Sequence, residues 1–328
     1  MSDSFLLNPL FKTLEEDLRQ VETCLEGILQ NKGGAVRPAG EALFRGGGKR
    51  IRPALVLWSS QILGARPQAA LPIAAAVEMV HGASLLHDDV IDQTTLRRGQ
   101  DTLNALHGNR YTVLLGDFLL TQALEAVCAV GQVQLVRVVS NAVAEMTLGQ
   151  ILELQHQGDM QTRTEDYLRI IDGKTASLMA AGCMLGGVLA GADEAQVQAL
   201  GKYGRHVGLA FQIIDDVLDY WGDPATLGKP VGSDLSERKF TLPFLLALEG
   251  ADSIQRGRLA HLLEGPVLGG EAFAEILALM EAKDSRTRSQ EMARDQARQA
   301  LEALDRLPAG RAREDLARLP GVLTRRDR

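Results

Sequence analysis

The chain has 328 residues and a formal net charge of −7, so it is long enough for one large domain or two ordinary ones. Hydrophobic residues make up 45% of it and aromatic residues only 4%, a composition typical of packed helices rather than of a β-sandwich. The acidic balance argues against nucleic acid as a partner. Cys24, Cys128 and Cys183 lack metal-ligand spacing, so we expect small core residues in a reducing compartment.

Helical periodicity is already visible in the first quarter of the chain. Apolar residues recur at helical spacing over residues 8–30, and a short helix is expected over 41–44. Pro53 is a natural first-turn residue, which predicts a helix over 53–63. A longer helix is expected over 69–94. The N-terminal residues lack a basic start followed by a long apolar run, so no signal peptide is expected.

The rest of the chain continues the same pattern. Helices are expected over residues 103–106, 113–130, 133–154, 164–171, 195–220, 272–280 and 289–304, with another starting at Thr241. The uncharged run 175–192 is rich in glycine and barely long enough to span a membrane, so we expect a packed internal helix there. No stretch has the alternation of a convincing strand. We therefore predict one all-α domain over residues 1–328, a helical bundle of about ten or more helices.

Two Asp-Asp-x-x-Asp sets lie within otherwise apolar helical runs. Their members are Asp88, Asp89, Asp92, Asp215, Asp216 and Asp219. On a helix, the first and last aspartates of a set lie one turn apart on one face. Carboxylates this close repel one another and are costly to desolvate, and a hard cation such as Mg²⁺ offsets that cost. Solvated acidic faces are the alternative, but two sets in the same apolar framing favour metal sites.

Cationic residues accompany the acidic sets. Lys49, Arg50 and Arg52 follow a run of glycines at an expected helix start, where the helix dipole favours an anion such as diphosphate; a flexible basic loop is the alternative. Arg97 and Arg98 follow the first acidic set, where they either neutralise carboxylates or hold phosphate. The isolated lysines are Lys174, Lys229 and Lys239. No catalytic triad or cofactor fingerprint is visible, so the chemistry should be electrostatic and centred on a diphosphate.

These motifs, in this order over roughly residues 44–245, resemble those of the trans-isoprenyl diphosphate synthases, and more closely those of the medium- to long-chain polyprenyl diphosphate synthases. The matching stretches are residues 47–53, His81 with 86–92, 97–99, 116–117, 174–176, 211–219 and 227–243. The resemblance implies an all-α isoprenoid synthase fold around a central cavity and a prenyltransferase that condenses isopentenyl diphosphate with an allylic diphosphate. Pro230 and Phe240 depart from the usual pattern and put only substrate detail in doubt.

The resemblance also implies roles for individual residues. Asp88, Asp92 and Asp215, with Asp89, Asp216 and Asp219 in support, would hold about three Mg²⁺ ions on the allylic diphosphate. The clamp on that diphosphate would be completed by Arg97, Lys174, Lys229 and Lys239. Isopentenyl diphosphate would be bound by Lys49, Arg52, His81 and Arg98. Thr175 and Gln212 would face the allylic cation as catalytic residues, together with Lys174 and the metal-binding aspartates. His87 is expected to make a structural hydrogen bond.

Product length is suggested by Ala83 and Ser84, which precede Asp88 by about 6–7.5 Å along the helix axis. In the family, aromatic residues at these positions stop growth at short products. Small residues here therefore favour a product beyond C20, of about C30–C50. The floor of the cavity is expected deeper, around residues 113–124 or 148–152.

Other readings share some of these features. A terpene cyclase has the first acidic motif but does not need the basic loop at 49–52. A metal phosphohydrolase is disfavoured because no histidines accompany the second acidic set. A non-catalytic partner subunit would have lost acidic motifs, whereas the catalytic half of a heteromer would keep them. By resemblance we expect a homodimer. The composition predicts a cytoplasmic protein without an integral membrane segment, and a transient membrane contact for product release is expected.

Overall fold

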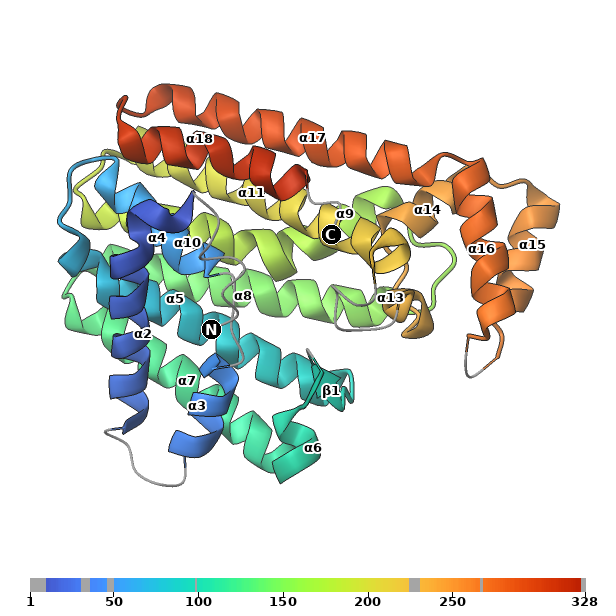
Figure 1. Ribbon diagram of the computed structural model, residues 1–328, viewed down its shortest axis with the longest axis horizontal. Coiled ribbons are helices and arrows are strands. Elements are labelled where there is room, and N and C mark those ends of the chain that lie inside the picture. Colours follow the sequence, from blue (N-terminus) through green and yellow to red (C-terminus); the bar gives the residue numbers. More distant parts are fainter. Residues whose placement is uncertain are drawn as a thin grey trace. The chain divides into compact units, whose positions relative to one another are not determined.

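The computed structural model describes residues 10–30, 36–45, 50–97, 99–223, 231–265 and 268–325. The chain divides into two compact units. Unit 1 comprises residues 1–144, 178–204 and 302–319, and unit 2 comprises residues 145–177, 205–301 and 320–328. Almost every element is helical (Figure 1). The all-α prediction is therefore confirmed.

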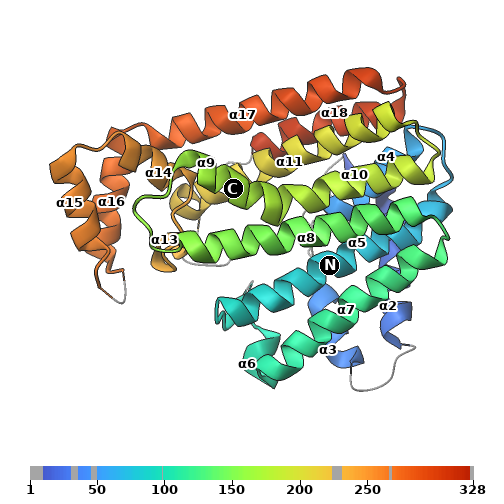
Figure 2. The ribbon, with the colours of Figure 1, turned by 180° about the vertical axis from the view of Figure 1, so that it is seen from behind.

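Unit 1 is built around helix α5 (Pro67–Ile91), which packs against α2, α4 and α7. The reverse view shows α7 running alongside α5 (Figure 2). The unit contains η1 (Phe11–Leu14), α2 (Glu15–Gln30), α3 (Arg37–Arg45), α4 (Ile51–Gln61), α6 (Leu103–His107), α7 (Asn109–Ala129) and the first part of α8 (Val133–His156). It also contains most of α10 (Ser177–Leu189), the start of α11 (Glu194–Trp221), η3 (Leu304–Arg306) and most of α18 (Arg311–Thr324).

Helix α4 begins two residues before the predicted start. Arg50 precedes it in a left-handed conformation, with a φ of 46°, so Pro53 occupies the third helical position instead of the first. A proline is still tolerated there because the first-turn amides have no partner within the helix. Trp58 in the same helix is fully buried and packs on Phe11, with ring centroids 5.3 Å apart.

A small hairpin corrects the prediction that the chain has no strands. β1 (Leu96–Arg97) pairs antiparallel with β2 (Gln100–Asp101). Gly99 has a φ of +74°, a conformation that glycine adopts without steric cost. Two-residue strands carry too little alternation to be recognised in a sequence.

Unit 2 contains the rest of α8 and α11, together with α9 (Thr164–Ile171), the π-helical turn η2 (Asp172–Ala176), α13 (Ser233–Ser236), α14 (Leu242–Glu249), α15 (Ser253–Leu262), α16 (Gly270–Ala282) and nearly all of α17 (Ser285–Ala303). Its core is an apolar cluster that includes Ile213, Ile214, Leu242 and Phe244. Helices α15 and α16 lie side by side (Figure 1), linked by an ion pair between Arg258 and Glu275. Helices α13, α15 and α18 were not predicted.

Two helices among the described residues, α5 and α7, are long and apolar enough to cross a membrane by length and composition alone. The apolar window of α5 is 72% buried within the protein, as expected of a core helix, whereas that of α7 is 33% buried. The run 175–192 forms the buried helix α10, as predicted. Cys183 lies in that helix, and burial raises the pKa of its thiol to about 12. Cys128 is exposed, so its placement in the core was wrong.

Candidate active site

The first acidic set closes helix α5. Asp88 and Asp92 are partly exposed, whereas Asp89 is only 4% exposed. The Asp92 amide donates to the Asp88 carbonyl at 2.8 Å as the last hydrogen bond of the helix. The set thus presents two accessible carboxylates and one buried carboxylate.

Arg97 from the hairpin neutralises the buried member. Its Nε and Nη2 atoms donate to Asp89 Oδ1 at 2.9 and 2.7 Å. Burial raises the pKa of Asp89, and the hydrogen bonds and charge of Arg97 oppose that rise. The Asn104 side chain donates to the carbonyl oxygens of Asp89 and Thr94 and so ties the helix end to the segment after the hairpin. Of the two roles predicted for Arg97, the structure shows the neutralising one.

His87 makes the structural contacts that were predicted for it. Its Nε2 lies 3.3 Å from the Val113 carbonyl oxygen and 3.5 Å from Asp117 Oδ1. A Cβ atom added to Gly116 would lie 2.3 Å from that nitrogen. Gly116 is therefore explained by the room that the imidazole needs, and Asp117 by its contact with that ring.

Arg52 and His81 lie together in unit 1, with Arg52 Nη1 3.3 Å from His81 Nε2. Arg50, which the sequence grouped with them, is 8% exposed and pairs at 2.5 Å with the buried Glu78. It is thus a structural residue, and its place in a basic loop that binds anions was wrong. Lys49, Arg98 and Lys229 lie outside the described residues.

The two positions linked to product length differ in their surroundings. Ala83 is 3% exposed and belongs to an apolar cluster with Leu86, Leu115 and Leu119, against which Phe118 packs. Ser84 is partly exposed, and its hydroxyl donates to the His81 carbonyl at 2.8 Å.

The second acidic set lies on α11 in unit 2 and is more deeply buried. Asp215 is partly exposed, but Asp216 and Asp219 are 3% and 1% exposed. Asp219 accepts from the Ser233 hydroxyl at 2.6 Å and from the Asp234 amide at 3.1 Å. It therefore anchors the first residues of α13.

Asp216 is held by two side-chain donors. The Tyr167 hydroxyl donates to Oδ2 at 2.6 Å, and Gln212 Nε2 donates to Oδ1 at 2.8 Å. Burial and the Asp234 carboxylate raise the pKa of Asp216, whereas the hydrogen bonds from Tyr167 and Gln212 oppose the rise. The other end of Gln212, its Oε1, accepts from the Thr175 hydroxyl at 2.8 Å.

Lys174 and Thr175 are carried by the π-helical turn η2, a rare element that often marks functional sites. Close backbone packing holds it on both sides. A Cβ atom at Gly149 of α8 would lie 2.5 Å from the backbone nitrogen of Lys174, and one at Gly208 of α11 would lie 2.5 Å from the Ala176 Cα. Arg205 of α11 also forms ion pairs with Asp172 and with Glu145.

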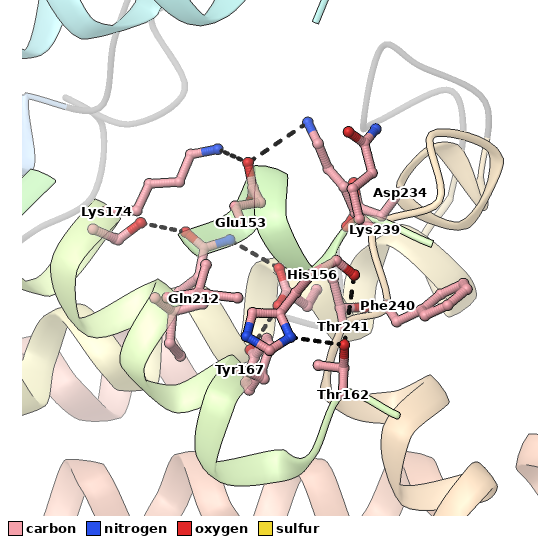
Figure 3. Close-up of a pocket in the computed structure, with 15 residues that line it drawn as sticks. Glu153, His156, Thr162, Tyr167, Lys174, Gln212, Asp234, Lys239, Phe240 and Thr241 are labelled. Carbon is pink, nitrogen blue, oxygen red and sulfur yellow. Dashed lines mark hydrogen bonds and ion pairs between the residues drawn. The ribbon is translucent and has the colours of Figure 1, made fainter. Parts of the chain in front are cut away.

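A pocket of about 160 Å³ in unit 2 lies beside this turn (Figure 3). Lys174 Nζ lies 2.5 Å from Glu153 Oε2, and Lys239 Nζ lies 4.0 Å from the same oxygen. Gln150 Nε2 also donates to that oxygen, at 3.2 Å. Two predicted phosphate-binding lysines thus converge on one partly buried carboxylate.

Sequence reasoning missed Glu153, Tyr167 and Arg205. Glu153 has a visible signal, because it is a carboxylate one turn after Gly149 in a largely apolar run. Tyr167 and Arg205 look like an ordinary apolar-face residue and an ordinary surface arginine, and nothing near them in the sequence marks their partners.

The described residues contain no group of three or more His, Cys, Asp or Glu side chains gathered as a metal site. The chemistry of the two acidic sets nevertheless suits a hard divalent cation, since both supply carboxylate oxygens. Asp88, Asp92 and Asp215 are the partly exposed members and so the ones accessible to an ion. The metal-binding roles therefore stay predictions.

Comparison with known proteins settles the family. A family model described as polyprenyl synthetase matches residues 35–280. The chain belongs to the polyprenyl synthetase family. It is an enzyme of the prenyltransferase class, and enzymes of this family generally use a divalent metal.

Individual relatives cover nearly the whole chain. The octaprenyl diphosphate synthase of Escherichia coli is 36% identical, over 95% of this chain and 97% of that protein. A short chain isoprenyl diphosphate synthase of Methanothermobacter thermautotrophicus is 38% identical, over 88% and 90%. A polyprenyl synthase of Caulobacter crescentus, solved with calcium and isoprenyl diphosphate, superposes with a TM-score of 0.92 at 34% identity, covering 97% of both chains. Fold and family are thereby fixed, whereas similarity over the whole chain does not decide product length.

Proposed function

We propose that this polyprenyl synthetase is a trans-polyprenyl diphosphate synthase. It would condense isopentenyl diphosphate head-to-tail with farnesyl or geranylgeranyl diphosphate and release a long product, of about C30–C50. The octaprenyl diphosphate synthase relative supports the long product.

The observation that carries the proposal is the convergence of Lys174 and Lys239 on Glu153 beside Thr175 and Gln212. Lys174 pairs with Glu153 at 2.5 Å, and Lys239 pairs with the more exposed Glu237 at 2.9 Å, so a bound anion would compete with these carboxylates for two ammonium groups beside the pocket. A diphosphate is the polyanion that such a site attracts, because its charge-assisted hydrogen bonds are stronger away from bulk water. The neighbouring hydroxyl and amide supply dipoles to a cation formed next to it.

The residues then divide the work of the reaction. Lys174 and Lys239, with Lys229, would bind the allylic diphosphate and stabilise its charge as the carbon–oxygen bond breaks. The oxygens of Thr175 and Gln212 would stabilise the allylic cation. Arg52 and His81, with Lys49 and Arg98, would hold isopentenyl diphosphate while its double bond attacks that cation. The departed diphosphate would accept the final proton, consistent with the lack of an evident side-chain base.

A divalent metal ion, when bound, would neutralise diphosphate charge and make it a better leaving group. Asp88 and Asp92 of α5 and Asp215 of α11 would hold such ions, and carboxylate oxygens suit Mg²⁺. About three Mg²⁺ ions per active site remain the expected number.

Product length would be set along the helix face before Asp88. The small side chains of Ala83 and Ser84 would leave room for a growing tail, and Leu115 and Leu119, which share an apolar cluster with Ala83, would meet it next. Replacing Ser84, the partly exposed member, by phenylalanine should shorten the product. Sizing the dephosphorylated products of wild type and Ser84→Phe would test this, and unchanged product length would contradict it.

The chain would act as a homodimer in the cytoplasm, as one domain, without an integral membrane segment. Leu148, Ile151 and Leu154 of α8 are 60%, 45% and 46% exposed, an apolar surface suited to a second copy. Such a surface also suits the catalytic half of a heteromer. Sedimentation of the purified chain would distinguish the two, because only the homodimer has twice the monomer mass without another protein. The protein would contact a membrane only while it releases product and would be in solution between turnovers.

The test of the proposed function is incorporation of labelled isopentenyl diphosphate with farnesyl or geranylgeranyl diphosphate and Mg²⁺, followed by product sizing. Long prenyl diphosphates would support the synthase. Consumption of the allylic diphosphate without isopentenyl incorporation would indicate a cyclase or a hydrolase instead.

A further inference from the structure

Four side chains of unit 2 form a continuous series of hydrogen bonds, and Figure 3 labels two of them, Gln212 and Tyr167. Thr175 donates to Gln212, Gln212 donates to Asp216, and Tyr167 donates to the other oxygen of Asp216. Three elements contribute, since Thr175 belongs to η2, Tyr167 to α9, and Gln212 and Asp216 to α11. Tyr167 and Asp216 are 3% exposed each.

The direction of this series follows from the chemistry of its members. A glutamine amide has a donor end and an acceptor end, whereas an ionised carboxylate only accepts, and this is the form to which Tyr167 and Gln212 both donate. The nitrogen of Gln212 must therefore face Asp216, and its carbonyl oxygen must face away, toward Thr175. The Thr175 hydroxyl then donates its proton to that carbonyl oxygen. Its lone pairs are therefore the part of the hydroxyl that faces the pocket.

We propose that Asp216 and Tyr167 are positioning residues that fix the orientation of Gln212 and Thr175 so that oxygen atoms, and not N–H or O–H groups, face the allylic cation. The inference rests on the proposed function, because it concerns the cation formed there. A fixed oxygen dipole stabilises a developing positive charge without reorganisation. If the Gln212 amide were flipped, its N–H group would face the cation and destabilise it.

The carboxylate of Asp216 has two oxygens, and Tyr167 is needed to fix which of them faces Gln212. With Tyr167 on Oδ2, the oxygen nearest Gln212 is Oδ1, and the carboxylate is held in one rotamer between α9 and α11. The tyrosine thus acts through Asp216 and Gln212 and does not itself face the reacting atoms. Both oxygens of Asp216 are used by this role, unlike those of a carboxylate dedicated to a metal ion.

The test compares Asp216→Asn and Tyr167→Phe with a matched control, Tyr203→Phe. Asparagine has one acceptor and one donor end, so it cannot accept from both Tyr167 and Gln212. Tyr203 is also fully buried and donates its hydroxyl proton at 2.7 Å, but to the Leu316 carbonyl in unit 1. Its variant therefore removes the same group without touching the series.

Two measurements should be made on each folded full-length variant, with folding checked by thermal unfolding. We expect kcat for isopentenyl incorporation to fall about 100-fold in Asp216→Asn and about 10-fold in Tyr167→Phe, with KM for the allylic diphosphate within about twofold. Binding of an ammonium mimic of the allylic cation, with Mg²⁺ and inorganic diphosphate present, should weaken in both variants, whereas binding of inorganic diphosphate should not. Tyr203→Phe should match wild type in every respect.

The double variant should be no slower than Asp216→Asn alone, because both residues act through one orientation. The proposal is overturned if the wild type is active and both variants have the same kcat and the same affinity for the ammonium mimic as the wild type. It is also overturned if Asp216→Asn raises the Mg²⁺ concentration needed for half activity while Tyr167→Phe behaves as wild type, since Asp216 would then serve the metal. An inactive wild type would instead reject the proposed function.

Discussion

The two acidic sets share one sequence pattern but occupy different environments. The first ends helix α5, where Asp88 and Asp92 are partly exposed and the one buried carboxylate is paired with Arg97. The second lies within α11, where Asp216 and Asp219 are buried and accept hydrogen bonds from neighbouring elements. A repeated motif thus does not imply repeated roles, because burial and donors decide what a carboxylate can do.

In both sets the partly exposed aspartates are the ones available to an ion, and the buried ones have structural partners. Asp89 organises the helix end and the hairpin, Asp216 orients Gln212, and Asp219 anchors the start of α13. We therefore expect substitutions to separate the six positions into two groups.

The largest effect is expected from the accessible members. Asp88→Ala and Asp215→Ala should each lower kcat for isopentenyl incorporation about 1000-fold, because the charge that holds the metal ions is lost. Asp305→Ala is the control, since that side chain is 77% exposed on the surface of unit 1. Activity within tenfold of wild type in either site variant would reject the metal-binding role of that residue.

A smaller kinetic effect should follow from Glu153→Gln, which keeps the shape but removes the charge between Lys174 and Lys239. The lysines would repel each other without the carboxylate, so we expect kcat/KM for the allylic diphosphate to fall about tenfold. Glu237→Gln is the control, because it removes the other carboxylate beside Lys239, at 2.9 Å, from a position that is 42% exposed. Equal losses in both variants would show that Glu153 has no special role.

Packing behind the first set can be tested with Gly116→Ala. The added methyl group would meet the His87 imidazole at 2.3 Å, so we expect the free energy of unfolding to fall by about 1–3 kcal/mol. Gly27→Ala, where nothing lies within 4 Å of the new Cβ, should instead stabilise helix α2 by about 0.5–1 kcal/mol. Denaturant titration measures both, and a neutral Gly116→Ala would mean that His87 can move freely.

The burial of Asp216 in the second set should make the stability of the protein depend on pH. Burial raises the pKa of Asp216 in the folded protein above its unfolded value of 3.8. The stability that Asp216 contributes is therefore fully present below the unfolded pKa and is lost as the pH rises through the folded pKa. In Asp216→Asn this loss disappears. Between about pH 4 and pH 8, without metal, the melting temperature of the variant relative to wild type should therefore rise by a few degrees. A constant difference would show that Asp216 keeps its ordinary pKa.

Much of this organisation could be read from the sequence, because long helices repeat apolar residues at a fixed period and the charged motifs interrupt them. The helices carrying both acidic sets and the buried helix α10 were predicted on that basis, whereas a structural hydrogen bond from His87 was expected from the family resemblance. The hairpin at 96–101, the partners of Tyr167 and the burial of Arg50 were not. Each of these depends on contacts between residues distant in sequence or on elements too short to show periodicity.

The most direct test of the difference between the two sets is Mn²⁺ binding, measured by electron paramagnetic resonance with a non-reactive allylic thiodiphosphate present. The six Asp→Asn variants should be compared with wild type. We expect binding to weaken strongly in the variants of Asp88, Asp92 and Asp215 and to stay near the wild-type level in those of Asp89, Asp216 and Asp219. Equal loss in all six folded variants would contradict the account, since every carboxylate would then be a metal ligand.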